Sequence, residues 1–179
     1  MPNWCSTDIE IIGPREEMNK LAAIINENKE PGFLETICPS PNSDWDYAWS
    51  VENWGTKWDL GDGHAEVEDL ATAHPILQAR LTIATETAWA PPLEALGTYL
   101  ENNPEFFVKC CYYEPGMDFA GIWEEGSDDC LQDLHDENID WAEPGSLARN
   151  LDDMYGICEE HAQYDEEEEE EEDFQDISI

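Results

Sequence analysis

The alternation of polar and apolar residues at the start of the chain predicts a strand followed by a helix. Residues 6–12 (Ser-Thr-Asp-Ile-Glu-Ile-Ile) alternate and then reach Gly13-Pro14, which is typical of the end of a strand. Pro14 suits the first position of a helix, because its ring fixes a helical φ. Four apolar residues at helical spacing give that helix one buried face: Met18, Leu21, Ile24 and Ile25.

Prolines and glycines divide the next part of the chain into short pieces. Residues 33–48 are expected to be irregular, because two prolines break any element there. Residues 47–54 regain the character of a strand. Residues 65–79 are expected to form a short helix that Pro75 limits.

A second strand and helix follow, and then a hairpin. Residues 80–89 alternate and predict a strand, after which two prolines at 91 and 92 start a helix. Residues 106–113 and 119–123 are apolar runs joined by a turn sequence, which predicts a hairpin. The predicted fold class is therefore α+β. The order β-α-β-β-α-β with an extra hairpin strand is that of a ferredoxin-like sandwich.

The composition becomes more acidic after Trp123. Ser127 is expected to cap a helix that runs to about Trp141, and residues 147–155 to form a second helix with Leu151 and Met154 inward. The last residues form an acidic run that cannot bury apolar surface. Three parts are therefore predicted: a ferredoxin-like domain (1–125), an acidic helical extension (126–164) and a disordered acidic tail (165–179).

The charge balance limits the classes of partner. The chain has 44 acidic and 7 basic residues, a formal net charge of −37. Without residues 165–179, 34 acidic residues still face 7 basic ones, a net charge of −27. Such a charge repels nucleic acid and anionic membranes, so neither is expected as a direct partner. Two explanations are open, halophilic solubility and a strongly basic partner, and the concentration of the charge toward the C-terminus favours the partner.

The sequence shows no constellation typical of catalysis. The four histidines (64, 74, 135 and 161) are scattered, the six cysteines lack Cys-x-x-Cys spacing, and no glycine-rich phosphate loop precedes a helix. We therefore expect no enzyme, no cofactor and no metal site. No signal peptide and no apolar run of spanning length is present. A reduced, cytoplasmic protein is the resulting expectation.

The segment Asn53-Trp54-Gly55-Thr56-Lys57-Trp58-Asp59 is the densest motif in the chain. The glycine between two tryptophans suggests a kink or the close approach of two backbone segments. Lys57 has two possible roles: it binds an anion, or it pairs with a local carboxylate while the two tryptophans pack. We predict a structural role for Asn53, Trp54, Gly55, Lys57, Trp58 and Asp59.

Four motifs in order carry a resemblance to a known family. They are Met1-Pro2-Asn3-Trp4-Cys5, the segment just described, Thr87-Ala88-Trp89-Ala90-Pro91-Pro92, and Tyr112-Tyr113-Glu114-Pro115-Gly116-Met117-Asp118-Phe119-Ala120-Gly121. Together they resemble the Api-like proteins of phages and plasmids, over about residues 1–125. The resemblance implies a ferredoxin-like domain and a mobile-element context. It implies no catalytic residues.

The acidic extension suggests mimicry of a phosphate backbone. On the predicted helix, Asp129, Asp133, Asp136 and Asp140 step by four, three and four residues and form one stripe. Such carboxylates have Cβ atoms about 5–6 Å apart, comparable to the several Å between phosphates of one DNA strand. The predicted partner-binding residues are Glu124, Glu125, Asp128, Asp129, Asp133, Asp136, Glu137, Asp140 and Glu143.

The leading hypothesis is a non-enzymatic DNA mimic from a phage or mobile element. Its partner would be a basic DNA-binding protein of the bacterial host, such as a restriction, CRISPR or repair nuclease, in the host cytoplasm. One alternative is an adaptor whose acidic and apolar end, residues 173–179, resembles the tip of bacterial single-stranded-DNA-binding proteins. Two others are an acidic face that serves only solvation, and an enzyme that uses the region of Trp54, Lys57 and Trp58.

Overall fold

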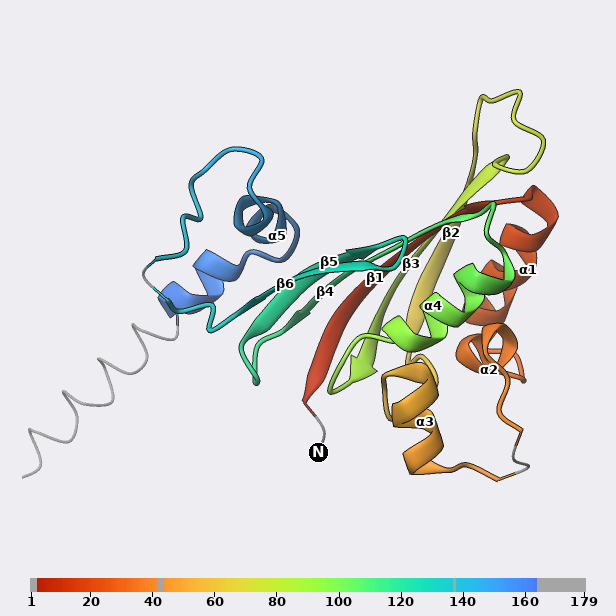
Figure 1. The fold of residues 1–179 in the computed structure, drawn as a ribbon, viewed down its shortest axis with the longest axis horizontal. Helices are drawn as coiled ribbons and strands as arrows, with labels where there is room; N and C mark the ends of the chain where they lie inside the picture. Colours follow the sequence, from red (N-terminus) through yellow and green to blue (C-terminus); the bar gives the residue numbers. More distant parts are fainter. Residues whose placement is uncertain (1–2, 42–43, 137, 164–179) are drawn as a thin grey trace, which may run out of the picture.

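Six strands form one antiparallel sheet, and helices pack on both of its faces (Figure 1). The computed structural model describes residues 3–41, 44–136 and 138–163. The strands are β1 (Trp4–Gly13), β2 (Gly63–Asp69), β3 (Ala79–Ala88), β4 (Phe107–Glu114), β5 (Phe119–Glu124) and β6 (Ser127–Gln132). The helices are α1 (Arg15–Asn26), α2 (Phe33–Ile37), α3 (Tyr47–Trp54), α4 (Leu93–Asn102) and α5 (Leu147–Tyr155), and residues 157–163 are helical as well.

The strands lie in the order β2-β3-β1-β4-β5-β6, and every neighbouring pair is antiparallel. The fold is therefore a mixed α+β fold, as predicted. Its strand order differs from that of a simple ferredoxin-like sheet, because two further strands extend the edge beyond β4. None of the helices in the described ranges has the length and apolar character that crossing a bilayer requires.

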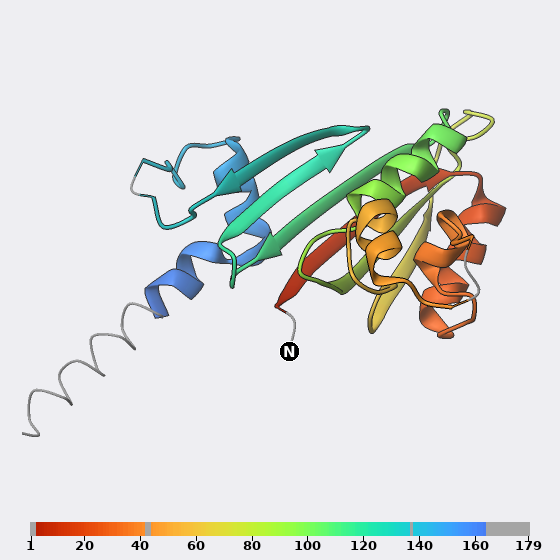
Figure 2. The ribbon, with the colours of Figure 1, turned by 60° about the horizontal axis from the view of Figure 1, so that its bottom comes forward.

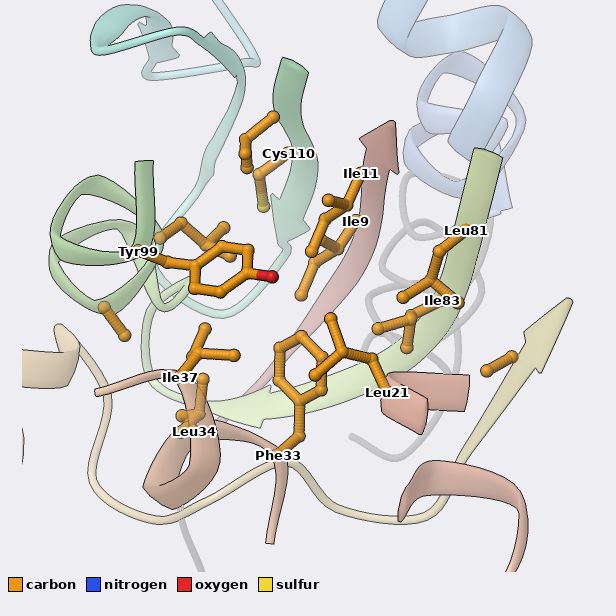
Figure 3. Close-up of a cluster of buried hydrophobic side chains, with 14 of the residues drawn as sticks. Ile9, Ile11, Leu21, Phe33, Leu34, Ile37, Leu81, Ile83, Tyr99 and Cys110 are labelled. Atoms are coloured by element: carbon orange, nitrogen blue, oxygen red, sulfur yellow. The ribbon is translucent and has the colours of Figure 1, made fainter. Parts of the chain in front are cut away.

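Helices α1 to α4 cover one face of the sheet and enclose the main core (Figures 1 and 3). In β1 and β3 every second side chain is buried, so one apolar row of each strand faces these helices. Figure 3 shows Ile9, Ile11, Leu81 and Ile83 of the two strands directed at the side chains of Leu21, Phe33, Leu34, Ile37 and Tyr99.

A second, smaller core lies on the opposite face, where α5 and the following helical residues pack over β4, β5 and β6 (Figures 1 and 2). Its buried members are Tyr113, Ala120, Leu134, Leu151 and Ile157. The Tyr155 hydroxyl donates a 2.9 Å hydrogen bond to the Asp8 carboxylate, which joins the end of α5 to β1. This contact fixes the C-terminal helices on the sheet.

The strictly periodic segments were predicted correctly. The strand at 6–12, the helix after Pro14 and the strand at 80–89 correspond to β1, α1 and β3. The helix after the two prolines is α4, and β4 and β5 form the predicted hairpin. The short helix at 147–155 is α5, although Met154 is exposed rather than inward.

Two predictions near the tryptophan motif were wrong. Residues 47–54 form helix α3 and not a strand: the Asp46 carboxylate accepts a 3.2 Å hydrogen bond from the Trp49 N–H, and Gly55 ends the helix at φ 84°. The region 33–48 is not irregular throughout, because residues 33–37 form α2. Local capping outweighs the strand-like composition of these residues.

The predicted helix at 65–79 was also wrong. Its first residues belong to β2, an edge strand that pairs with β3 in the register Ala65–Ile83 and Val67–Leu81. Ala65 is buried while the charged residues beside it are exposed, so the segment has the period of a strand.

The predicted helix from Ser127 to Trp141 is absent from the described residues as well. Ser127 begins β6, which pairs with β5 through a two-residue turn. The turn residues Glu125 and Gly126 have φ values of 49° and 91°, the positive values that tight hairpins need. The boundary proposed at residue 126 therefore lies within a hairpin of the sheet, whereas the acidic run at 165–179 lies outside the described residues.

Candidate binding surfaces

The acidic residues predicted to bind a partner lie on the β5–β6 hairpin and the loop after it, not on one helix face. Glu124 ends β5, Glu125 is in the turn, and Asp128 and Asp129 point to opposite faces of β6. The members beyond the strand lie in the loop that follows β6 rather than on a helical stripe: Asp133, Asp136, Asp140 and Glu143. All eight described members of the predicted set are exposed, and Glu137 lies outside the described residues.

Several of these carboxylates have local hydrogen-bond partners. Asp128 accepts a 2.7 Å bond from the Tyr112 hydroxyl, and Asp140 accepts a 3.0 Å bond from the Ala142 N–H. The backbone N–H of Asn138, followed by its side-chain amide, lowers the pKa of Asp136. Hydrogen bonds therefore order part of the loop, and its carboxylates stay exposed to an approaching partner.

The basic residues add little free positive charge to this surface. Within the described ranges, all but Lys57 form ion pairs with carboxylates. The pairs include Arg15–Asp69, Lys20–Glu16, Lys29–Glu27, Arg80–Glu10, Lys109–Glu124 and Arg149–Asp153. Solvent-exposed pairs of this kind contribute little to stability. Because these cations are already paired, few unpaired positive charges remain on the described surface to repel a basic partner.

The segment from Asn53 to Asp59 joins three parts of the fold. The Trp54 indole is buried and donates a 2.8 Å hydrogen bond to the Cys38 carbonyl. The Thr56 hydroxyl donates a 2.9 Å bond to the Ala88 carbonyl at the end of β3. A Cβ on Gly55 would lie 3.1 Å from the Pro91 carbonyl oxygen. The glycine is therefore needed for a close backbone approach as well as for its positive φ.

The other motif residues have equally specific contacts. The Asn53 side-chain amide donates a 2.9 Å hydrogen bond to the Trp49 carbonyl, within α3. The Asp59 carboxylate accepts bonds of 2.8 and 2.9 Å from the N–H groups of Leu34 and Glu35, in the first turn of α2. It thus supplies the cap that Gly32, the residue before α2, cannot supply.

Lys57 lies between two indole rings. Its Nζ is 4.3 Å from the ring centroid of Trp58 and 4.8 Å from that of Trp89. These rings continue into an aromatic patch, because Trp4 packs on Trp58 and Tyr47 packs on Trp89. The patch, completed by the exposed Trp45, was not predicted as a group. Its members come from β1, helix α3 and the loops around it, and the end of β3, and pairing of β1 with β3 places Trp4 next to the residue before Trp89.

A cleft of about 490 Å³ opens beside the aromatic patch. Trp4, Tyr113 and Tyr155 supply aromatic walls, and Glu86 and Glu160 supply carboxylates. Buried Glu114 also lines the cleft, but it holds the β4–β5 turn by accepting the N–H groups of Gly116 and Met117. Aromatic faces with nearby carboxylates suit a cationic side chain such as lysine or arginine.

The buried thiols are poorly suited to nucleophilic chemistry. Burial raises the pKa of Cys5 to about 12 and raises the pKa of Cys38, Cys110 and Cys111 as well. Because the thiolate is the nucleophile, a raised pKa leaves these groups protonated and unreactive near neutral pH.

Two of the four histidines meet in space although the sequence separates them. His135 and His161 stack with ring centroids 3.8 Å apart, and His135 Nδ1 is 3.3 Å from an Asp118 oxygen. The sequence carried no spacing signal for this group, because its members come from a hairpin turn, a loop and the C-terminal helical residues.

Comparisons with family models, with curated proteins and with solved structures found no match to this chain. The fold and the surfaces therefore define only a class: an α+β protein with a strongly anionic surface, an aromatic patch and an acidic cleft.

Proposed function

We propose that this chain is a non-enzymatic inhibitor that presents carboxylates in place of DNA phosphates and occupies the DNA-binding groove of a basic host protein. The observation that carries the proposal is the unbalanced charge of the folded body. Its basic side chains are paired with carboxylates or, for Lys57, stacked with indoles, while the predicted binding carboxylates are exposed. A basic partner therefore meets a surface whose net charge is strongly negative.

In this proposal the β5–β6 hairpin, rather than the predicted helix, spaces the carboxylates of the binding surface. Adjacent strands lie about 4.8 Å apart, and every second residue of a strand, on the same face, is about 7 Å away. Glu124 and Asp129 share one face of the hairpin as diagonal neighbours about 7–8 Å apart, an interval similar to that between phosphates of one strand, whereas Asp128 lies on the other face. Asp133, Asp136, Asp140 and Glu143, in the described parts of the loop after β6, extend this surface.

The cleft beside the aromatic patch offers a place for one anchoring side chain. Glu86 and Glu160 would neutralise an inserted lysine or arginine, and the rings of Trp4 and Tyr155 would contact its stem. Long-range attraction and one anchoring pocket together favour a fast, salt-sensitive association.

The resemblance stated from the sequence gives this proposal its biological setting. We interpret strands β2-β3-β1-β4 with α1 and α4 as a ferredoxin-like unit, because helices connect β1 to β2 and β3 to β4. The resemblance to Api-like proteins supports a phage or mobile-element origin and action in the cytoplasm of a bacterial host. Restriction, CRISPR and repair nucleases are the target classes.

A direct test measures plasmid cleavage by purified restriction, CRISPR and repair nucleases in the presence of the full chain. Inhibition of at least one, relieved by salt and by competing non-cleavable duplex DNA, is the expected result. A variant with Asp129, Asp133, Asp136 and Asp140 changed to asparagine should lose most of this inhibition. A control with Glu16, Glu17, Glu27 and Glu30 changed to glutamine removes the same charge from the α1 side and should retain it.

Equal loss in both variants would show a diffuse polyanion effect and would refute a defined mimic. Removal of residues 165–179 separates the proposal from the tail-adaptor alternative. Inhibition that survives this truncation assigns binding to the folded body, whereas loss only on truncation assigns it to the tail.

A further inference from the structure

The strongest unassigned chemistry in the described residues is a group of two imidazoles and one carboxylate. One ligand atom from each of Asp118, His135 and His161 lies within 4.8 Å of the other two. This combination differs from the many acidic pairs on the surface, because imidazole nitrogens select zinc and related transition metals over calcium and magnesium.

The second core positions the two histidines, and the β4–β5 turn positions Asp118. His135 follows Leu134, which is buried in this core, within a turn closed by a 2.8 Å bond from the Asp136 N–H to the Asp133 carbonyl. His161 comes one helical turn after the buried Ile157. Asp118 has a φ of 59° and immediately precedes β5. Each ligand is thus adjacent to an anchored residue.

Ring contacts hold the two imidazoles beside each other. The His135 and His161 rings are nearly parallel, with 18° between their planes, and Trp141 packs edge-on against His161 at 6.4 Å. An imidazole binds a metal in the plane of its ring, so at least one of these nearly parallel rings turns when both bind the same ion.

The distances are close to those of a tetrahedral site. Zinc bonds of about 2.0–2.1 Å to nitrogen and oxygen place neighbouring ligand atoms about 3.3 Å apart. His135 Nδ1 and the Asp118 oxygen are 3.3 Å apart, so this pair already has that separation. The remaining separations, up to 4.8 Å, require a contraction of at most about 1.5 Å, which side-chain rotation provides.

We propose that Asp118, His135 and His161 bind a zinc ion. Two neutral imidazoles and one carboxylate leave a fourth position for water, and the surrounding negative charge favours a divalent cation. The bound ion links the β4–β5 turn, the loop after β6 and the C-terminal helical residues. The site thus stabilises the C-terminal helices on the sheet, independently of any inhibitory function.

The test is a calorimetric titration of the full chain with zinc chloride near neutral pH, in excess magnesium chloride to suppress diffuse binding. Cys130 and Cys158 are exposed and are changed to serine in the parent to remove thiol ligands. We expect one equivalent of zinc to bind. His135→Gln and His161→Gln should each weaken binding at least about tenfold. His64→Gln, which alters an exposed histidine on β2, should leave it unchanged.

A second readout guards against variants that are merely misfolded. Zinc should shift the imidazole nitrogen resonances of two histidines in the parent and should raise its melting temperature. The proposal is overturned if His135→Gln and His161→Gln bind zinc as the parent does, or if magnesium displaces zinc completely. A thiolate charge-transfer band with cobalt would assign the metal to the remaining cysteines and would overturn it equally.

Discussion

Asp59 is the motif residue whose removal has the most direct structural consequence. Its two carboxylate oxygens accept the N–H groups of Leu34 and Glu35 at 2.8 and 2.9 Å. These are the donors that an N-terminal cap normally satisfies, and Gly32 has no side chain with which to do so. Asp59→Ala leaves both donors without their acceptor.

The expected cost follows from those two bonds. A hydrogen bond to a charged group contributes about 1.5–3 kcal/mol when buried, and loss of a cap costs about 0.5–2 kcal/mol. Asp59 is only partly buried, so water replaces part of each bond in the variant. We expect Asp59→Ala to lower the free energy of unfolding by about 2 kcal/mol, and the melting temperature by about 4–8 °C. Asp59→Asn keeps one acceptor and should cost about half as much.

Urea unfolding followed by tryptophan fluorescence measures this change, with Asp62→Ala as the matched control. Asp62 is exposed and three residues away, so its truncation should change the free energy of unfolding by less than about 0.5 kcal/mol. Equal effects of Asp59→Ala and Asp62→Ala would refute the assignment of Asp59 as the cap of α2. So would a cost for Asp59→Asn that matches the cost of Asp59→Ala.

Three further predictions concern the second core, the thiols and the aromatic patch. Burial and the Asp8 carboxylate raise the pKa of Tyr155, so its stabilising contribution is complete below about pH 10 and is lost as the pH rises further. Tyr155→Phe should lower the free energy of unfolding by about 1–2 kcal/mol near neutral pH. The variant should also lose less stability than the parent when the pH is raised above 10, and urea unfolding near neutral pH and above pH 10 measures both effects. A thiol-specific disulfide reagent should label the exposed Cys130 first in the native chain, then Cys158, whose pKa partial burial and Asp152 raise, and the four buried thiols only on unfolding. Lys57→Gln should cost about 0.5–1 kcal/mol and alter tryptophan fluorescence, because it removes a cation from between two indoles.

Sequence periodicity was sufficient where one side of an element is buried along its whole length. In β1 and β3 strict alternation identified the strands, and in α1 the spacing of Met18 and Leu21 identified the buried helix face. Helix α3 was missed although its signals are present in the sequence, since Asp46 and Gly55 are good caps. The aromatic composition between them was given too much weight.

Strand β6 could not be predicted from its own residues. Aspartate is unfavourable in strands, and two successive aspartates suggest a loop or the start of a helix. Pairing with β5 and the hydrogen bond from Tyr112 to Asp128 outweigh the low strand propensity of aspartate. The acidic set was therefore predicted as an exposed group but assigned to the wrong element.

The grouping of the three residues of the proposed zinc site could not be predicted from the sequence, for a related reason. Nothing in local spacing brings Asp118, His135 and His161 together, because the contact depends on where α5 returns to the sheet. The same holds for Trp4 and Trp89, which become neighbours only once β1 is paired with β3. The residue types are evident in the sequence, whereas their grouping depends on the pairing of strands and the packing of helices.

The acidic edge strand of the sheet affects whether copies of this chain associate with one another. β6 is an edge strand whose unpaired backbone groups could template pairing with another chain. Asp128 and Asp129 place a carboxylate on each face of that strand, so a second copy approaching edge to edge meets like charge on both sides. The charge that would attract a basic partner therefore also keeps these chains apart from one another. Concentrated salt, which screens this repulsion, is the condition under which the edge becomes prone to self-association.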